Sequence, residues 1–189
     1  MEFDELEKEI KNSKNNIIIK KRTNENDDIL NILNNKLLQM IVDNTEFIKV
    51  NYIIRIFGSK IKEENDKYLD YIPHHYLIIA NDVFGGLFAL NKDNIMYFAI
   101  DTLEWESLDI DYPQFIIWVI GNDILSFYEE FIDDEIKNLI PKIDFNSCIQ
   151  FYPYPYTKEF NINSSSKKII SSDELIKLNF DVAKQIDIL

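Results

Sequence analysis

The chain is poor in the residues that many enzymes use for covalent and metal chemistry. It has one cysteine, two histidines and four glycines among 189 residues. Cys148 cannot form an internal disulfide, and its apolar neighbours Ile149 and Phe151 indicate a small buried hydrophobe rather than a nucleophile. His74 and His75 are adjacent, so on a strand they would point in opposite directions and could not share one metal ion. We therefore expect no metal site, no catalytic residue of these types, and a loop at the histidine pair.

Long apolar runs and phosphate-binding glycine motifs are also absent. No run approaches the roughly 18 residues that a membrane helix requires. The acidic N-terminus MEFDELEKEI lacks the basic and apolar regions of a secretory signal. We therefore expect a soluble, cytoplasmic protein with no membrane contact. Neither G-x-G-x-x-G nor a P-loop lysine occurs at the Gly85-Gly86 pair, so we expect no nucleotide and no other cofactor.

Positive charge is scarce. The chain has 20 Lys and Arg residues against 33 Asp and Glu residues, which gives a formal net charge of -13. Nucleic-acid binding depends on clustered Lys and Arg that displace counterions from phosphates, so we expect no nucleic-acid partner. A basic protein partner suits this charge better.

The chain does have enough apolar material for one core. Hydrophobic residues make up 46% of it and aromatic residues 13%, which predicts a single domain over residues 1–189. The stretch 76–108 predicts four successive short strands separated by turn residues. Within it, residues 87–90 and 95–100 flank the turn sequence N-K-D-N and predict a β-hairpin.

Segments before and after this stretch predict helical cover with further strands. Before it we expect a helix over 2–12, a strand over 15–21, a helix capped by Asn24 or Asn26, one long strand or a hairpin bent near Asn51 over 46–57, and an exposed loop or short helix over 60–70. After it we expect two short helices or one kinked helix over 112–131 with a break at Gly121 and an N-cap at Asn122 or Asp123, a helical turn over 134–139, strands over 148–152 and 167–170, and a last helix to about Ile186.

The last helix carries its own start signal. Residues 171–174, S-S-D-E, have the pattern of a capping box. The helical spacing of Leu175, Leu178 and Val182 predicts that these three side chains are buried. Together the patterns predict an α+β fold with a mainly antiparallel sheet from 46–57, 76–108 and 148–152, flanked by helices mostly on one face.

Several motifs resemble one family of bacterial proteins, the domain of unknown function 2625 family. They are ANDVFGGLFALN at 80–91, YFAIDTLEWESL at 97–108, FIIWVIGNDILSFY at 115–128, RIFGS at 55–59, FYPYPYTKE at 151–159 and ELIKLNFDVAKQ at 174–185. The resemblance covers about residues 45–186 and leaves 1–44 as a mostly helical N-terminal part. The family usually carries a longer glycine-rich insertion where this chain has only residues 91–94. It implies no established reaction.

At a greater distance, the strand-rich centre is similar to the SUKH superfamily of α+β proteins. Many of those are bacterial immunity proteins, so the resemblance implies a non-catalytic module that binds and neutralises a toxin domain. The candidate contacts are acidic residues of the central sheet, the glycine pair and two aromatic anchors: Asp82, Gly85, Gly86, Asp101, Glu104, Trp105, Glu106, Asp109 and Tyr112. A solvated acidic face explains the same acids equally well. The glycine pair fits a sharp turn or a nest of amides that holds an anion.

A carboxylate-dependent hydrolase or divalent-cation-binding enzyme is the alternative. Asp82 and Asp101 stand at predicted strand ends, and Glu104 and Glu106 share one face of a predicted strand, as an acid and base pair or cation ligands would. No nucleophile elbow or histidine base accompanies them. The sequence therefore favours binding over catalysis.

Overall fold

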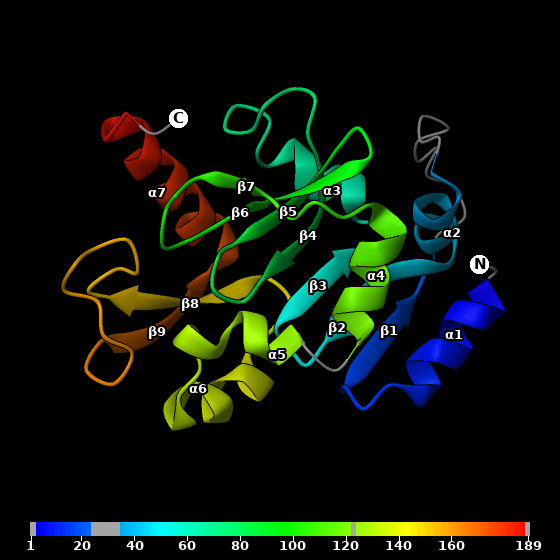
Figure 1. The fold of residues 1–189 in the computed structure, drawn as a ribbon, viewed down its shortest axis with the longest axis horizontal. Coiled ribbons are helices and arrows are strands. Elements are labelled where there is room, and N and C mark those ends of the chain that lie inside the picture. Colours follow the sequence, from blue (N-terminus) through cyan, green and yellow to red (C-terminus); the bar gives the residue numbers. More distant parts are fainter. Residues whose placement is uncertain (1–2, 24–34, 122–123, 188–189) are drawn as a thin grey trace.

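A seven-stranded antiparallel sheet forms the centre of the molecule (Figure 1). The computed structural model describes residues 3–23, 35–121 and 124–187. Within them the strand order in space is the order in sequence: β1 (Ile17–Lys21), β2 (Thr45–Val50), β3 (Ile54–Phe57), β4 (Leu77–Asp82), β5 (Leu87–Asn91), β6 (Asn94–Phe98) and β7 (Trp105–Ser107). The four strands predicted in 76–108 are therefore confirmed as β4 to β7.

Residues 46–57 form a hairpin, which settles the alternative left open by the sequence. Strands β2 and β3 pair antiparallel from Phe47 opposite Phe57 to Val50 opposite Ile54. The turn between them is made possible by Asn51 at φ 50°, a left-handed conformation that asparagine tolerates better than most residues. The hairpin of β5 and β6 is likewise confirmed.

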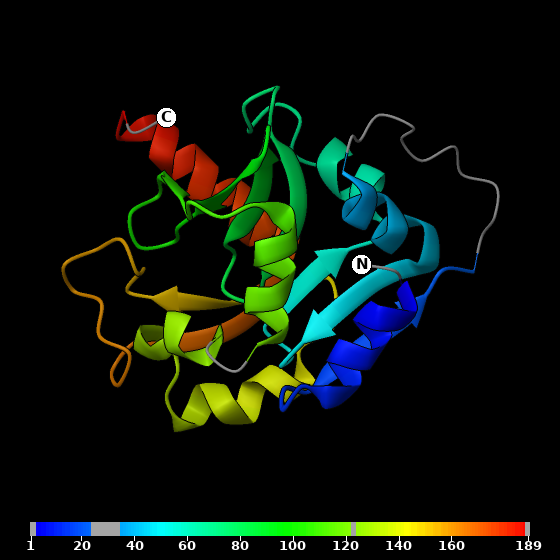
Figure 2. The same ribbon diagram turned by 45° about the vertical axis from the view of Figure 1, so that its right-hand side comes forward.

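Helices cover both faces of the sheet. Adjacent residues on a strand point to opposite faces, and on β6 Tyr97 stacks near Phe88 whereas Phe98 stacks on Phe180. Phe88 in turn contacts Phe115 of α4 (Tyr112–Ile120), whereas Phe180 belongs to α7 (Ser172–Gln185). The ribbons of α4 and α7 accordingly lie on opposite sides of the strands in Figure 2. The expectation that the helices lie mostly on one face is therefore wrong.

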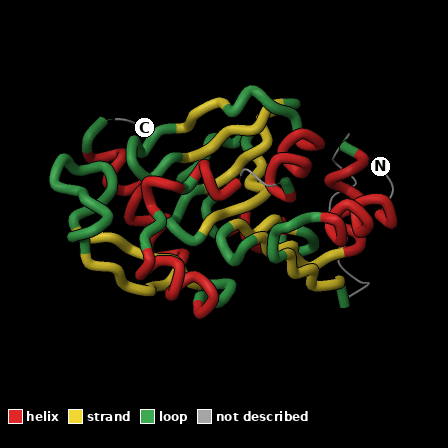
Figure 3. Tube along the Cα trace, turned by 60° about the horizontal axis from the view of Figure 1, so that its bottom comes forward, coloured by secondary structure: helices red, strands yellow, loops and turns green. Residues whose placement is uncertain are grey.

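A second, two-stranded sheet stands apart from the first (Figure 3). It pairs β8 (Ser147–Tyr152) with β9 (Ser166–Ser171), so the strand predicted over 148–152 exists but does not join the main sheet. Both neighbours of β4 are already strands of the main sheet, and β8 instead touches its end, where the Ile149 amide donates to the Val83 carbonyl at 2.6 Å.

The remaining helices confirm most predicted segments. They are α1 (Phe3–Asn12), α2 (Lys36–Asn44), α3 (Ile61–Asp66), α5 (Ile124–Phe127), the 3-10 turns η1 (Glu129–Phe131) and η2 (Ile140–Lys142), and α6 (Asp134–Leu139). The expected caps Asn24, Asn26, Asn122 and Asp123 lie outside the described residues. Helix α3 confirms the short-helix alternative for 60–70. Its buried Asn65 side-chain amide donates to the Ile61 and Ile78 carbonyls at 2.7 and 2.8 Å.

Helix α7 begins without its predicted capping box. Ser171 makes no side-chain capping hydrogen bond, since it is still paired with Ser147 in the second sheet. Leu175 is buried as predicted, but Leu178 and Val182 are only half-buried, and the face turned to the core instead carries Ile176, Asn179, Phe180 and Ala183.

Candidate functional site

The Asp82 carboxylate, at the end of β4, accepts hydrogen bonds from three segments of the chain: the turn after β4, strand β6 and the residues after α5. Its Oδ1 accepts hydrogen bonds from the amides of Phe84 and Gly86 at 2.8 and 2.9 Å. Its Oδ2 accepts from the hydroxyls of Tyr97 and Tyr128 at 2.9 and 3.1 Å. The side chain is fully buried, so Asp82 cannot contact a partner directly. The predicted position of Asp82 at a strand end is confirmed, but its predicted role as an accessible contact residue is wrong.

The Gly85-Gly86 pair serves this same carboxylate. Gly85 has φ +96°, a conformation that favours glycine. A Cβ at Gly86 would overlap Asp82 Oδ2 and the Tyr97 hydroxyl. The Gly86 amide donates to the Asp82 carboxylate and the Gly85 amide to the Asp82 backbone carbonyl at 3.4 Å, so neither is free for an external anion, and the pair is a turn rather than an anion site.

Burial governs the ionisation of this cluster. It raises the pKa of Asp82 above its ordinary value, and the hydrogen bonds from Gly86, Tyr97, Phe84 and Tyr128 oppose that rise. Burial, together with the Asp82 charge, also raises the pKa of Tyr97 and of Tyr128. Both tyrosines therefore remain neutral donors across the physiological range.

The rings of these two tyrosines also line a surface hollow of about 240 Å³. Its acidic lining comes from Asp101, Glu106, Glu129 and Glu130, and its aromatic lining includes Phe127 and Phe131. We call this site the acidic hollow. Glu106 reaches it because β7 places that residue opposite Tyr97 in register, and η1 with the residues before it supplies the others.

The four acids of the hollow are not neutralised by ion pairs within the described part of the chain. None of them forms an ion pair with any residue that the structure describes; Glu106 accepts a hydrogen bond from the Thr102 hydroxyl at 3.0 Å. By contrast, Glu46 on β2 pairs with both Lys20 and Lys60.

The sequence contains a signal for this imbalance that the prediction missed. From residue 93 to residue 136 the chain has no lysine, arginine or histidine. The acids in that stretch are Asp93, Asp101, Glu104, Glu106, Asp109, Asp111, Asp123, Glu129, Glu130, Asp133, Asp134 and Glu135. Only the last three of these form ion pairs in the described part of the chain, with Lys137 or Lys167.

The other predicted contacts do not gather at the hollow. Glu104 is exposed, precedes β7 and does not line the hollow. The Asp109 carboxylate accepts a hydrogen bond from the Ser107 hydroxyl at 2.6 Å and stays in its own turn. Asp101 and Glu106 are thus the two predicted acids that the fold brings together.

The two predicted aromatic anchors lie elsewhere. Trp105 pairs in register with Phe98, so its ring faces α7 and packs at 5.0 Å from Tyr76, half-buried. Tyr112 is fully buried in α4. Its assignment as a surface anchor is therefore corrected to a core residue.

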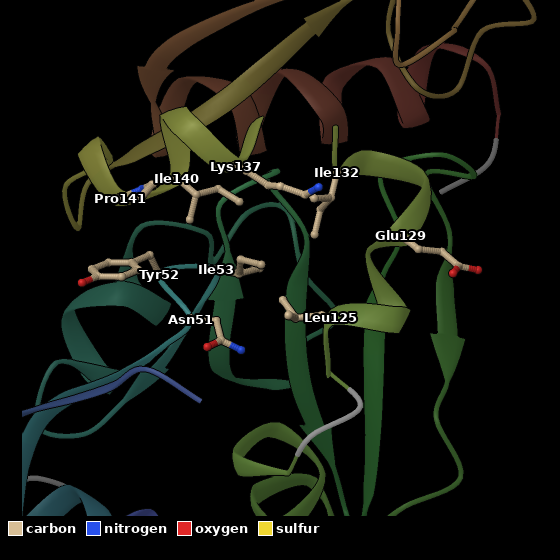
Figure 4. A pocket seen from close by; sticks show the side chains of 9 residues that line it. All are labelled: Asn51, Tyr52, Ile53, Leu125, Glu129, Ile132, Lys137, Ile140 and Pro141. Atoms are coloured by element: carbon tan, nitrogen blue, oxygen red, sulfur yellow. The ribbon is translucent and has the colours of Figure 1, made fainter. Parts of the chain in front are cut away.

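A second concavity borders the first. It has a volume of about 460 Å³ and is lined by Asn51, Tyr52, Ile53, Leu125, Glu129, Ile132, Lys137, Ile140 and Pro141 (Figure 4). We call it the apolar groove, because aliphatic side chains from the β2–β3 turn, α5 and the α6–η2 segment face it. No sequence pattern predicted it, since its walls come from three separate segments.

Cys148 and Arg55 form a buried polar contact on the other side of Asp82. The Arg55 guanidinium donates to the Asp144 carbonyl at 3.0 Å and to the Ser147 carbonyl, which anchors the start of β8. Cys148 is buried as predicted, and burial raises the pKa of its thiol to about 11. A thiol of this kind is a poor nucleophile.

The described residues lack two features that would point to other classes of protein. They contain no group of three or more His, Cys, Asp or Glu side chains arranged to hold a metal ion. Among them, too, no helix has both the length and the apolar character needed to cross a bilayer.

The geometry defines a single α+β domain with a sequential antiparallel sheet and an acidic hollow beside an apolar groove. The chain belongs to the family described as "Protein of unknown function DUF2625", whose model matches residues 2–175. It is 32% identical over 113 residues to "Putative uncharacterized protein YbfG" of Escherichia coli strain K12, a match that covers 56% of this chain and 51% of that protein.

A protein of Haemophilus influenzae, named only "Uncharacterized protein", is 26% identical over 121 residues, covering 60% of this chain and 53% of its own length. The chain thus spans about half the length of the curated relatives it matches.

Proposed function

We propose that this protein is a non-catalytic binding module that holds a basic protein partner, in the way that an immunity protein neutralises a toxin, in the cytoplasm. The observation that carries the proposal is the acidic hollow, whose lining includes Asp101, Glu106, Glu129 and Glu130, none of which forms an ion pair with a described residue.

Electrostatics favours a cationic ligand at such a site. Four carboxylates lining about 240 Å³ repel one another, and a lysine or arginine side chain that enters the hollow relieves this repulsion while gaining attraction. Phe127, which also lines the hollow, adds an aromatic side chain to which a cation is attracted. A protein supplies such single side chains, whereas a nucleic acid would bring phosphates that the hollow repels.

A carboxylate-dependent hydrolase or divalent-cation-binding enzyme is the second candidate. One observation favours it, because Asp101 and Glu106 meet in a concave site beside tyrosine rings, as an acid and base pair would. Asp82, which the same hypothesis used as a catalytic acid, is fully bonded and buried. We therefore place binding first.

The test uses two charge-matched variants. The hollow variant carries Asp101→Asn, Glu106→Gln and Glu130→Gln. The control variant carries Asp70→Asn, Glu159→Gln and Asp181→Asn, which are exposed acids without an ion pair to any described residue. Both change the net charge equally, so general electrostatic attraction is held constant.

Each tagged protein is used for affinity capture from its native lysate at low salt, and each captured partner is then purified and titrated by calorimetry. We expect a basic protein that binds the wild type and the control but binds the hollow variant at least about tenfold more weakly. Equal binding by all three proteins, or no partner at low salt, would overturn the proposal. Hydrolysis of model esters or glycosides that is lost in the hollow variant would establish the second candidate instead.

A further inference from the structure

The apolar groove is open to solvent at its centre. Leu125 is 47% exposed there, although large aliphatic side chains are usually buried. The groove is backed by Ile53 and Ile140, both buried, and its volume of about 460 Å³ lies in the range of ligand-binding pockets.

Apart from Glu129, the polar side chains at its margin are engaged in contacts within the chain. The Asn51 amide donates to Asn15 at 2.9 Å, and its carbonyl accepts from the Asn16 amide. Lys137 pairs with Asp134 at 3.0 Å. The groove therefore offers an apolar surface with little polar chemistry of its own, which suits an apolar side chain rather than a polar metabolite.

Glu129 joins the groove to the acidic hollow. It lines both concavities, and Figure 4 shows its carboxylate directed away from Ile53 and Leu125. The short segment from α5 to η1 thus presents apolar surface toward one side and negative charge toward the other. A ligand in the groove lies next to the Glu129 carboxylate. A positive charge on that ligand is therefore attracted to the site.

We propose that the partner contacts this surface through one continuous segment in which a bulky apolar side chain stands beside a lysine or arginine, the apolar side chain seated in the groove and the cation in the acidic hollow. The inference rests on the proposed function and specifies the chemistry of the partner's contact. An apolar anchor in a pocket with charged contacts around it is the usual arrangement of an interface hot spot.

The test begins with a selection that assumes no partner. A phage-displayed library of random dodecapeptides is selected on the wild-type protein, and selected peptides are synthesised with a fluorescent label for anisotropy titration. We expect enrichment of peptides that combine Lys or Arg with Leu, Ile, Phe or Trp. Replacing the apolar residue of the peptide by serine, or its cation by glutamine, should each weaken binding about tenfold or more.

Protein variants then locate the peptide. Leu125→Ser removes the exposed apolar contact, and Leu69→Ser, which is 54% exposed outside the groove, removes a similar one elsewhere. We expect Leu125→Ser to weaken peptide binding about tenfold, whereas Leu69→Ser leaves it unchanged and Leu125→Met, which preserves apolar volume, restores most of it. Circular dichroism confirms that each variant is folded.

The outcomes distinguish failure of this inference from failure of the proposed function. Purely basic peptides that bind Leu125→Ser as well as the wild type would overturn the inference and leave the acidic-hollow proposal standing. Purely apolar peptides that ignore the hollow variant would overturn both. Absence of any enriched peptide would overturn the inference, as would sedimentation showing a wild-type dimer that Leu125→Ser dissociates, because a second copy would then fill the groove.

Discussion

Two sets of carboxylates lie on either side of Tyr97 and Tyr128 and have opposite environments. Asp82 alone forms the first set, and the four acids of the hollow form the second. On the inner side, Asp82 is fully buried and accepts four hydrogen bonds. On the outer side, Glu106 and its neighbours line a hollow and form no ion pair with a described residue. The difference indicates that Asp82 serves stability, whereas the hollow acids, of which Glu106 accepts one hydrogen bond from Thr102, contribute little to it.

Replacing Asp82 should have the largest effect. Asp82→Ala leaves two buried amides and two buried hydroxyls without an acceptor, and each unsatisfied donor destabilises a fold by about 1–3 kcal/mol. Allowing for partial relaxation, we expect the free energy of unfolding to fall by about 4 kcal/mol. Urea denaturation measures it, with Glu130→Ala as the surface counterpart, which should change stability by less than about 0.5 kcal/mol. Similar losses for the two variants would remove the distinction between the two sets.

Substitution of Gly86 tests the same cluster by adding a methyl group instead of removing a hydrogen-bond acceptor. Gly86→Ala places a methyl group against Asp82 Oδ2 and the Tyr97 hydroxyl, so we expect a loss of about 3 kcal/mol in urea denaturation. In an Asp82→Ala background the clash with Asp82 Oδ2 is absent. Gly86→Ala should therefore lower the free energy of unfolding by less than it does in the wild type. Additive losses would show that the methyl group is accommodated away from Asp82.

The pH dependence of the stability that Asp82 contributes provides a further test of the comparison. Burial raises its folded pKa above the value near 4 of the unfolded chain, so the folded state holds the proton more tightly. That contribution to stability is complete below about pH 4 and is lost as pH rises through the folded pKa, with a slope of at most about 1.4 kcal/mol per pH unit.

We therefore expect the stability advantage of wild type over Asp82→Asn to be largest near pH 4 and to shrink as pH increases. Groups common to both proteins cancel in this difference, which urea denaturation between pH 4 and pH 8 measures. An advantage that instead grows with pH would show that the four hydrogen bonds hold the pKa of Asp82 below its unfolded value.

Local patterns in the sequence predicted the strands well, because hairpin turns and alternation are local properties. They placed β5, β6 and the connecting turn within one or two residues of their observed ends. They placed β8 in the wrong sheet, since a short strand pattern such as Cys148–Phe151 does not indicate which strand edge it pairs with.

The candidate site was predicted less well for the same reason. The environment of Asp82 is completed by Tyr128, which lies 46 residues further along the chain, so no local pattern could show that this acid is buried. Asp101 and Glu106 were predicted as contacts, but Glu129 and Glu130 were not, because they reach the hollow only through the packing of α5 and η1 on the sheet. The stretch without cations between Lys92 and Lys137 was the available signal for all four.

Neutralising the hollow should have the smallest effect on stability and the opposite sign. The variant with Asp101→Asn, Glu106→Gln and Glu130→Gln loses mutual repulsion but no ion pair to a described residue, so we expect it to unfold with a free energy about 0.5 kcal/mol higher than wild type at low salt. The gain should disappear near 1 M salt, where charges are screened within about 3 Å. The Asp70→Asn, Glu159→Gln and Asp181→Asn control, whose acids do not line the hollow, should gain less. A hollow variant that is more stable yet binds no basic partner would show that the acids are retained for binding at the expense of stability, whereas a less stable variant would mean that they support the fold as Asp82 does.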